Sequence, residues 1–255
     1  MTDITLILPA FNEAGSIEQT IKQAVRYFES RNLSFQIIVA ADGTDGTREL
    51  VRKLGETDNR LVVIGHSQRS GKGKGVREAV QLANSKIIGF ADADNKVPLE
   101  ELDKVLPLFE KGSSMVIGSR ALRTSRIERE PPIHRRLGSR VFTLGLHAII
   151  GSLAADTQCG FKFFTHEAAK RIFAVQRIDG YMFDVEVLSL AKAFGYPISE
   201  IAVRWRDDGD TRLQLFRGNI RNIIDLLRIR LSMATASPSK SKPLAAAAGA
   251  DAEIP

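Results

Sequence analysis

The sequence predicts an α/β protein with a mostly parallel sheet and helices on both faces of that sheet. Up to about residue 120, short apolar runs alternate with segments whose apolar residues recur at helical spacing. The runs lack an in–out alternation, which is typical of parallel strands buried on both faces. The length of 255 residues, with 44% hydrophobic and 26% charged residues, suits one soluble domain.

The first half of the chain supplies its elements in regular order. Parallel strands need crossover connections, so the loops that follow the strands should meet at one edge of the sheet. Strands are expected at 3–9, 35–41, 60–64, 86–91 and 113–119, and helices at 12–30, 45–55, 74–84 and from Pro98 to Phe109.

The second half is less regular. After a basic stretch at 120–136, helices are expected near 134–150, 166–174 and 182–194, and a strand at 197–203. Apolar residues at helical spacing, with arginines on other faces, then predict a C-terminal basic amphipathic helix over 216–231. Residues 234–255 are low-complexity Ala, Ser, Pro and Lys and are expected to be disordered.

Composition excludes several classes of protein. Cys159 is the single cysteine and the four histidines lack metal-ligand spacing, so neither an intramolecular disulfide nor a zinc site is expected, and a reducing compartment is favoured. The N-terminus lacks the basic region of a signal peptide. The uncharged stretch between Arg140 and Asp156 is too short for a bilayer, so no transmembrane helix is expected.

The net charge of +6 is concentrated in two segments. Residues 120–140 contain seven Arg against two Glu, and residues 204–230 contain seven Arg against four Asp. Such clusters favour an anionic partner, which could be nucleic acid, a membrane surface or a phosphorylated substrate. The alternative is a solvated basic face.

Function-like residues follow the expected strands. Asp92 and Asp94 are two positions apart after the fourth strand, so both carboxylates can face one divalent cation. Mg²⁺ or Mn²⁺ is usually held by one or two carboxylates together with substrate phosphates. Lys72 lies in a glycine-rich turn before a helix and can face a phosphate. The plainer alternatives are a pair of helix-capping aspartates and an ordinary strand-to-helix turn.

Eight strings in register give these residues a context. They are PAFNE (9–13), the DGT turn after the second strand, GKGKGV (71–76), ADAD (91–94), GSRA (118–121), DTQCGFKFFT (156–165), FDVEVL (183–188) and EIAVRW (200–205). Together they resemble family 2 glycosyltransferases of the GT-A fold, which is Rossmann-like. DTQCGFK and FDVE most resemble the dolichyl-phosphate β-glucosyltransferase branch, with polyprenyl-phosphate mannose synthases as near relatives.

The resemblance implies a donor site in the first half of the chain. Pro9, Phe11, Glu13 and Asp42 would surround the base and ribose of a nucleotide sugar, Lys72 would face its phosphates, and Asp92 and Asp94 would hold Mg²⁺ or Mn²⁺ on its diphosphate. Two positions depart from the family: Phe11 replaces the usual Tyr, and Ala41-Asp42 replaces two consecutive acids. The choice between UDP-glucose and GDP-mannose therefore stays open at this loop.

The resemblance also implies the acceptor, a dolichyl or polyprenyl phosphate. Its phosphate is already ionised near neutral pH, so cations that align it are needed more than a strong base. Arg120 and Arg135 match the arginines with that task, and Asp156 and Asp94 complete the expected catalytic set. The sugar and acceptor site would further contain Gln158, Lys162, Asp184 and Glu186. For Asp156, a purely loop-fixing role is the alternative.

We therefore expect an inverting, metal-dependent hexosyltransferase. Residues 1–233 would form one GT-A domain, with a nucleotide-sugar half (about 1–119) and an acceptor- and membrane-facing half (120–233). The protein would be cytoplasmic, peripheral on the cytosolic face of a membrane and attracted by anionic lipid, and would not bind nucleic acid. The rival hypotheses are a soluble or protein acceptor, and a non-catalytic basic module that binds membrane or nucleic acid.

Overall fold

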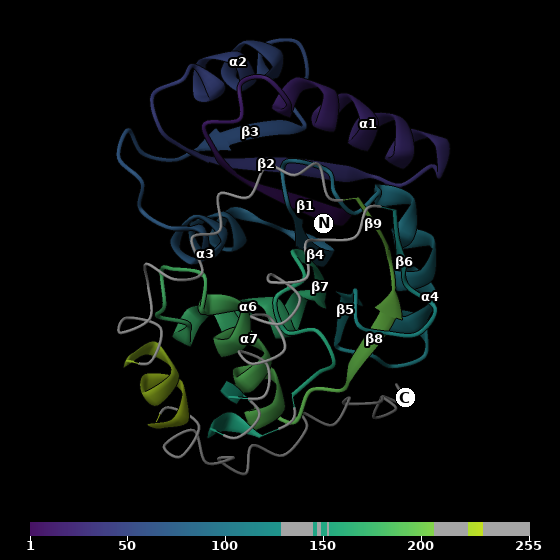
Figure 1. The fold of residues 1–255 in the computed structure, drawn as a ribbon. Helices are drawn as coiled ribbons and strands as arrows, with labels where there is room; N and C mark the ends of the chain where they lie inside the picture. The colour runs from purple at the N-terminus through teal and green to yellow at the C-terminus, as the bar shows by residue number, and fades with distance from the viewer. Residues whose placement is uncertain (129–144, 147–148, 152, 207–223, 232–255) are drawn as a thin grey trace, which may run out of the picture.

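A computed structural model describes residues 1–128, 145–146, 149–151, 153–206 and 224–231 of the chain. Its centre is a seven-stranded sheet in the order β3-β2-β1-β4-β7-β5-β8 (Figure 1). The strands are β1 (Thr2–Phe11), β2 (Phe35–Asp42), β3 (Leu61–Ile64), β4 (Ser85–Ala91), β5 (Met115–Ser119), β7 (Phe161–Thr165) and β8 (Ile198–Ala202). All neighbours pair in parallel except at β7, which is antiparallel to both β4 and β5.

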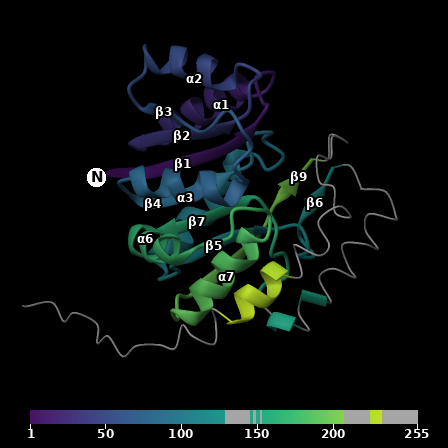
Figure 2. The same ribbon diagram turned by 90° about the vertical axis from the view of Figure 1, so that its left-hand side faces the viewer.

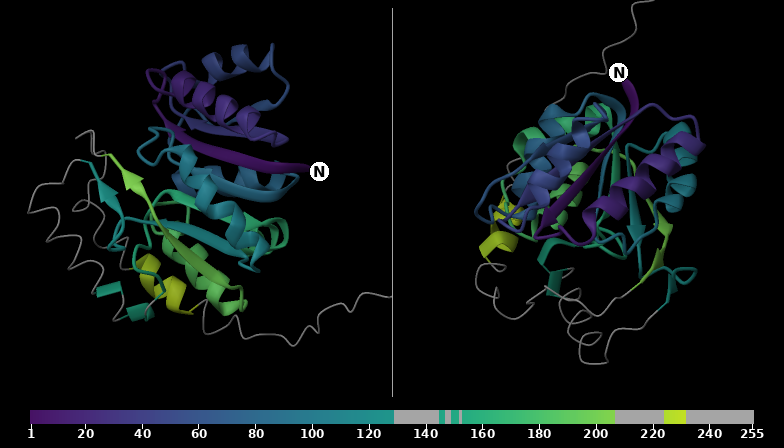
Figure 3. Two further views of the ribbon diagram at one scale, coloured as in Figure 1. Left: turned by 90° about the vertical axis from the view of Figure 1, so that its right-hand side faces the viewer. Right: turned by 90° about the horizontal axis from the view of Figure 1, so that it is seen from above.

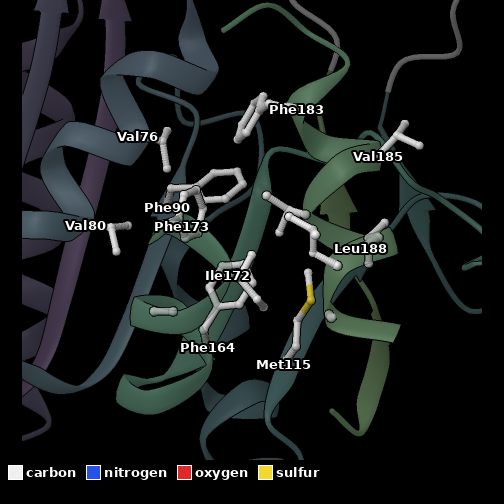
Figure 4. Packing of buried hydrophobic residues seen from close by; sticks show 14 of the residues in the cluster. Val76, Val80, Phe90, Met115, Phe164, Ile172, Phe173, Phe183, Val185 and Leu188 are labelled. Carbon is white, nitrogen blue, oxygen red and sulfur yellow. The ribbon is translucent and has the colours of Figure 1, made fainter. Parts of the chain in front are cut away.

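Helices cover both faces of this sheet, as predicted (Figure 3). One face packs against α1 (Ile17–Ser30), α2 (Thr47–Gly55), the 3₁₀ turn η1 (Leu99–Glu101) and α4 (Leu102–Glu110). The other packs against α3 (Lys72–Leu82), α6 (His166–Val175) and α7 (Phe183–Ala193). Figure 4 shows part of this second layer, where Phe90 of β4 lies 5.5 Å from Phe183 of α7 between their ring centroids.

Strand β7 is the main feature that the sequence did not predict. It fits beside β4 because Gly89 has no side chain: a Cβ there would lie 2.0 Å from the ring of Phe163. A second small sheet, β6 (Arg126–Ile127) with β9 (Arg204–Trp205), was also not predicted. The expected helix at 12–30 begins only at Ile17, because Asn12 adopts a positive φ of 56° and the chain turns there.

The expected C-terminal elements are described only in part. Helix is present at 145–146 and 149–150, and again at 224–231, while the rest of the expected helices at 134–150 and 216–231, and the tail 234–255, lie outside the described residues. The 224–231 helix packs beside α7 (Figure 2), because Leu226 and Ile229 join the same core cluster as Val185 and Leu188. Among the described residues, no helix has the length and apolar character needed to cross a membrane.

Candidate active site

The site lies at the edge of the sheet where β1, β2 and β4 end. Phe11 and Asp42 are the last residues of two paired strands, and Asp92 follows the end of β4 directly. Parallel pairing therefore brings the predicted base-binding and metal-binding residues to one edge, which is where ligands bind in open α/β sheets.

Each carboxylate of the Asp92–Asp94 pair contacts a lysine. Lys72 Nζ lies 2.6 Å from Asp92 Oδ1, and Lys96 Nζ lies 2.8 Å from Asp94 Oδ2. Burial and repulsion from Asp92 raise the pKa of Asp94, against the opposing effect of Lys96. Burial lowers the pKa of Lys72, but the nearby carboxylates of Asp92 and Asp184 outweigh it and the net pKa is raised. The two carboxylates are thus close enough to repel one another, and each is paired with a lysine ammonium.

The chemistry of these donors fits a hard divalent cation. Two carboxylates 34% and 42% exposed can supply oxygen ligands while leaving the remaining positions to water and a diphosphate. Over the described part of the chain, no group of three His, Cys, Asp or Glu residues forms a complete protein cage. The arrangement therefore suits a metal that arrives with its phosphate ligand.

Asp92 is held in place by the residue before β7, the strand that the sequence did not predict. Its backbone N–H donates to the carbonyl of Gly160, at 3.0 Å, immediately before β7. A Cβ on Gly160 would lie 2.0 Å from Asp92 Oδ2, so only glycine permits this approach. The glycine of the DTQCG string thus shapes the predicted metal site.

Arg120 and Asp156 form a two-pronged ion pair beside this site. Arg120 Nε and Nη2 donate to the two carboxylate oxygens at 2.6 and 2.9 Å, and the Arg120 backbone N–H adds a third bond at 3.0 Å. Burial raises the pKa of Asp156, but Arg120 more than offsets it, so the carboxylate stays ionised. Asp156 therefore fixes the direction of the guanidinium, whose carbon lies 5.6 Å from the ring of Trp205.

Lys162 and Asp184 are buried beneath the site. Their ammonium and carboxylate are in direct contact with both side chains almost fully excluded from water, and Lys162 Nζ also donates to the carbonyl of Cys159 at 2.8 Å. The family resemblance places them in the sugar and acceptor site. In the structure their charges neutralise one another and join β7 to α7. Burial raises the pKa of the Cys159 thiol to about 12.

Glu186 is buried as well and shapes a loop. Its carboxylate accepts bonds from the backbone N–H groups of Arg177 and Ile178, at 2.9 and 2.8 Å, and from the Gln176 side chain at 2.8 Å. This loop packs on the glycine-rich turn, because the N–H of Gly73 donates to the carbonyl of Asp179 at 2.8 Å. Glu186 thus acts on the site indirectly: it fixes the loop that supports the glycine-rich turn containing Lys72.

The predicted base-binding residues also lie at this edge. Asp42 accepts bonds from the backbone N–H groups of His66 and Ser70, at 3.0 and 2.6 Å, so it holds the loop between β3 and α3. Phe11 lies 4.4 Å beneath the guanidinium of Arg69, which donates to the Tyr181 hydroxyl at 2.7 Å. Glu13 accepts a bond from the Ser16 hydroxyl at 2.7 Å.

The other predicted residues divide into two groups. Pro9 lies in β1 opposite Ala40, and the backbone N–H of Gln158 donates to Asp156 at 3.2 Å. Arg135 lies outside the described residues. Sequence reasoning missed Arg69, Tyr181 and Lys96. Of these only Lys96 carried a signal, as a cation two positions after Asp94.

A cavity of about 460 Å³ adjoins the loop after Asp94. It lies between the α1 side of the sheet and the β6–β9 ribbon, and its lining is mostly polar and charged. Its walls include Gln23, Asn95, Lys96, Arg204, Trp205 and Arg206.

Known proteins resemble this chain in sequence and in fold. The model of glycosyl transferase family 2 matches residues 5–173. The dolichyl-phosphate β-glucosyltransferases of Dictyostelium discoideum and Homo sapiens are each 29% identical to the chain, cover 89% of it and are themselves covered to 73% and 75%. That of Mus musculus is 30% identical, with coverages of 89% and 75%.

Solved structures share the fold. Mannosyl-3-phosphoglycerate synthase from Rubrobacter xylanophilus has a TM-score of 0.68 at 15% identity, covering 95% of this chain and 78% of that one. Glucosyl-3-phosphoglycerate synthase from Mycobacterium tuberculosis, in complex with Mn²⁺, UDP-glucose and phosphoglyceric acid, has a TM-score of 0.65 at 19% identity, with coverages of 94% and 82%. These likenesses confirm the predicted fold class.

Proposed function

Because the chain belongs to glycosyl transferase family 2 and is a glycosyltransferase, we propose that it transfers glucose from UDP-glucose to a dolichyl or other polyprenyl phosphate. The reaction would be metal-dependent and inverting and would take place at a membrane surface. The names of the curated relatives support the sugar and the acceptor. UDP-glucose and Mn²⁺ are bound by a structural relative and support the donor and the metal.

The observation that carries this proposal is the grouping of carboxylates and cations at the ligand edge. Asp92 and Asp94 each contact a lysine, and Arg120, oriented by Asp156, is near enough to interact electrostatically with Asp92. Transfer between two phosphorylated molecules needs cations that hold both against their mutual repulsion. A module that only bound anions would gain nothing from two carboxylates at this edge.

The residues then have separate tasks. Asp92 and Asp94 would hold Mg²⁺ or Mn²⁺, which when bound offsets the charge that develops on the departing diphosphate. Lys72, beside Asp92, would bind the same diphosphate. Arg120 would align the acceptor phosphate for attack at the sugar C1, and a single in-line displacement from an α-linked donor gives a β-linked product.

The membrane part of the proposal rests on the 224–231 helix. Its buried side joins the core through Leu226 and Ile229, while Ile224, Leu227 and Leu231 are 43%, 52% and 68% exposed. Arg228 is exposed on the same helix. An apolar face with adjacent cations is typical of helices that lie in an anionic membrane surface. Together with the lone thiol, this supports a peripheral position on a cytosolic face.

An assay of donors and acceptors tests the function. The purified protein is incubated with UDP-glucose and GDP-mannose in competition, with Mn²⁺ or Mg²⁺, and with either a polyprenyl phosphate or 3-phosphoglycerate as acceptor. We expect a β-linked glucosyl lipid and a kcat/KM at least about tenfold higher for UDP-glucose, equal to about 1.4 kcal/mol. A mannosyl lipid would overturn the donor, and glycosylated phosphoglycerate alone would overturn the acceptor.

Sedimentation with vesicles tests the membrane part. Leu227→Asp should weaken binding to vesicles that contain anionic lipid, because it places a charge on the exposed apolar face. Leu82→Asp is the matched control, since Leu82 is 54% exposed at the end of α3. If both variants and the wild type bind vesicles equally, the 224–231 helix is not part of the proposed membrane interface.

A further inference from the structure

Lys96 has no task in the proposed reaction, yet the fold directs it onto the predicted metal site. Asn95 adopts a positive φ of 52°, and its N–H donates to the carbonyl of Asp92 at 3.1 Å. This turn reverses the chain, so that Lys96 Nζ returns to Asp94 Oδ2 at 2.8 Å and the Lys96 N–H reaches Asp94 Oδ1 at 3.3 Å. The contact is therefore built by the backbone.

The surroundings give the Lys96 side chain a fixed base and space to move. Its carbonyl accepts a bond from the Arg206 N–H at 3.0 Å, which ties the backbone to the segment after β9. The side chain is only 18% exposed, but it forms part of the wall of the 460 Å³ cavity described above. The ammonium can thus leave Asp94 while the turn stays in place.

The charges predict what this contact does to a metal ion. With Lys72 on Asp92 and Lys96 on Asp94, both carboxylates are already neutralised by ammonium groups. A divalent cation that arrives alone must displace or approach these positive charges, which opposes its binding. A diphosphate reverses the balance, because its oxygens attract the ammonium groups and also ligate the metal.

We propose that Lys96 is a built-in counter-ion of Asp94 that makes metal binding depend on the nucleoside diphosphate. This inference rests on the proposed function in that the donor supplies the diphosphate. Lys96 is then a positioning residue: without a diphosphate it opposes tight binding of a divalent cation, and it releases Asp94 when the diphosphate arrives. Linkage requires that the metal strengthens diphosphate binding by the same factor by which the diphosphate strengthens metal binding.

Titration with Mn²⁺ tests the inference without turnover. The affinity is measured from the electron paramagnetic resonance signal of free Mn²⁺, first with protein alone and then with saturating UDP. We expect Lys96→Met to bind Mn²⁺ at least about tenfold more tightly than the wild type without UDP, and to lose a similar factor of the UDP-dependent gain. Lys96→Gln, which keeps a polar side chain, should behave alike.

Lys86→Met is the matched control. Lys86 lies at the start of β4, far along the strand from the loop that contains Lys96, and its ammonium lies 2.7 Å from Asp3 Oδ1, so the variant removes one positive charge from another lysine–aspartate pair. It should leave the Mn²⁺ affinity unchanged. Circular dichroism of each variant confirms that it is folded.

The two arms of the titration separate this inference from the proposed function. Wild-type Mn²⁺ affinity in both folded Lys96 variants, or no Mn²⁺ binding in any state, would overturn the role of Lys96, even if a glucosyl lipid is formed. Tighter Mn²⁺ binding in the variants without UDP, combined with no effect of UDP on any protein, would show that Lys96 competes with the metal but would overturn the dependence on a nucleoside diphosphate, and with it the proposed donor.

Discussion

Two lysine–aspartate pairs of this protein differ in how much water they meet. The Lys162–Asp184 pair joins β7 to α7 and is almost fully buried, whereas in the Lys96–Asp94 pair the carboxylate is 34% exposed at the ligand edge. A buried pair cannot exchange its partner for water, so it fixes position. A partly exposed pair can exchange its partner for water, so its members remain available to a ligand. We therefore expect the buried pair to stabilise the fold and the pair at the ligand edge to serve the proposed reaction.

Breaking the buried pair should have the largest effect on stability. Lys162→Met leaves the Asp184 carboxylate buried without its closest cation and should lower the free energy of unfolding by about 3–5 kcal/mol. Urea denaturation measures the loss. The double variant with Asp184→Leu should recover most of it, because no buried charge then remains. A loss below about 1 kcal/mol in the single variant would show that the pair does not stabilise the fold.

Removing the charge of Asp94 from the partly exposed pair should instead reduce activity. Asp94→Asn should lower kcat by about 100-fold or more, because a metal ligand is lost, while the free energy of unfolding changes by less than about 1 kcal/mol. Glucosyl transfer and urea denaturation are measured on the same preparation. Asp103→Asn is the control, since Asp103 is 44% exposed and pairs with Arg31 away from the site. Normal turnover of the Asp94→Asn variant would contradict the assignment of Asp94 as a metal ligand.

A third pair, Lys86 with Asp3 near the start of β4, should have the smallest effect on the free energy of unfolding. Lys86 and the Ser34 hydroxyl lower the pKa of Asp3 to about 2. Because the folded pKa is depressed, its contribution is present above the unfolded pKa of about 4 and is lost as the pH falls toward 2.

Both groups of this pair are well hydrated, so Lys86→Met should cost at most about 1 kcal/mol at pH 7, and less in high salt. Urea denaturation at low and high ionic strength checks this expectation. If Lys86→Met lowered the free energy of unfolding as much as Lys162→Met does, exposure to water would not determine how much each pair stabilises the fold.

The sequence predicted the first half of the fold well because its signals are local. Each strand from β1 to β5 is a short apolar run, and the loop after β4 contains Asp92 and Asp94 only two positions apart in the chain. Strand β7 escaped prediction because its partners lie far away along the chain and because Lys162 interrupts its apolar run. No signal in the neighbouring sequence predicts that a lysine between aromatic residues will be buried against an aspartate of α7.

The same limit applies to the site. The predicted acceptor residues Lys162, Asp184 and Glu186 lie close to the ligand edge, but their atoms bind the protein itself. Motif strings identify which residues belong to a site and do not separate the groups that contact substrate from the groups beneath them. The Lys96–Asp94 contact depends on the left-handed turn at Asn95, which spacing alone does not reveal.

The antiparallel strand β7 has a consequence for the order of assembly. Strand β7 lies inside the sheet, between β4 and β5. Because β4 ends at Ala91 and β7 begins at Phe161, the ribosome synthesises β7 long after β4. Until then β4 presents an open edge to other chains, and edges of this kind promote aggregation. Pairing across so long a loop is also slow. We therefore expect the nascent chain to need protection during synthesis, with Asp92 reaching its final position only after Gly160 has emerged.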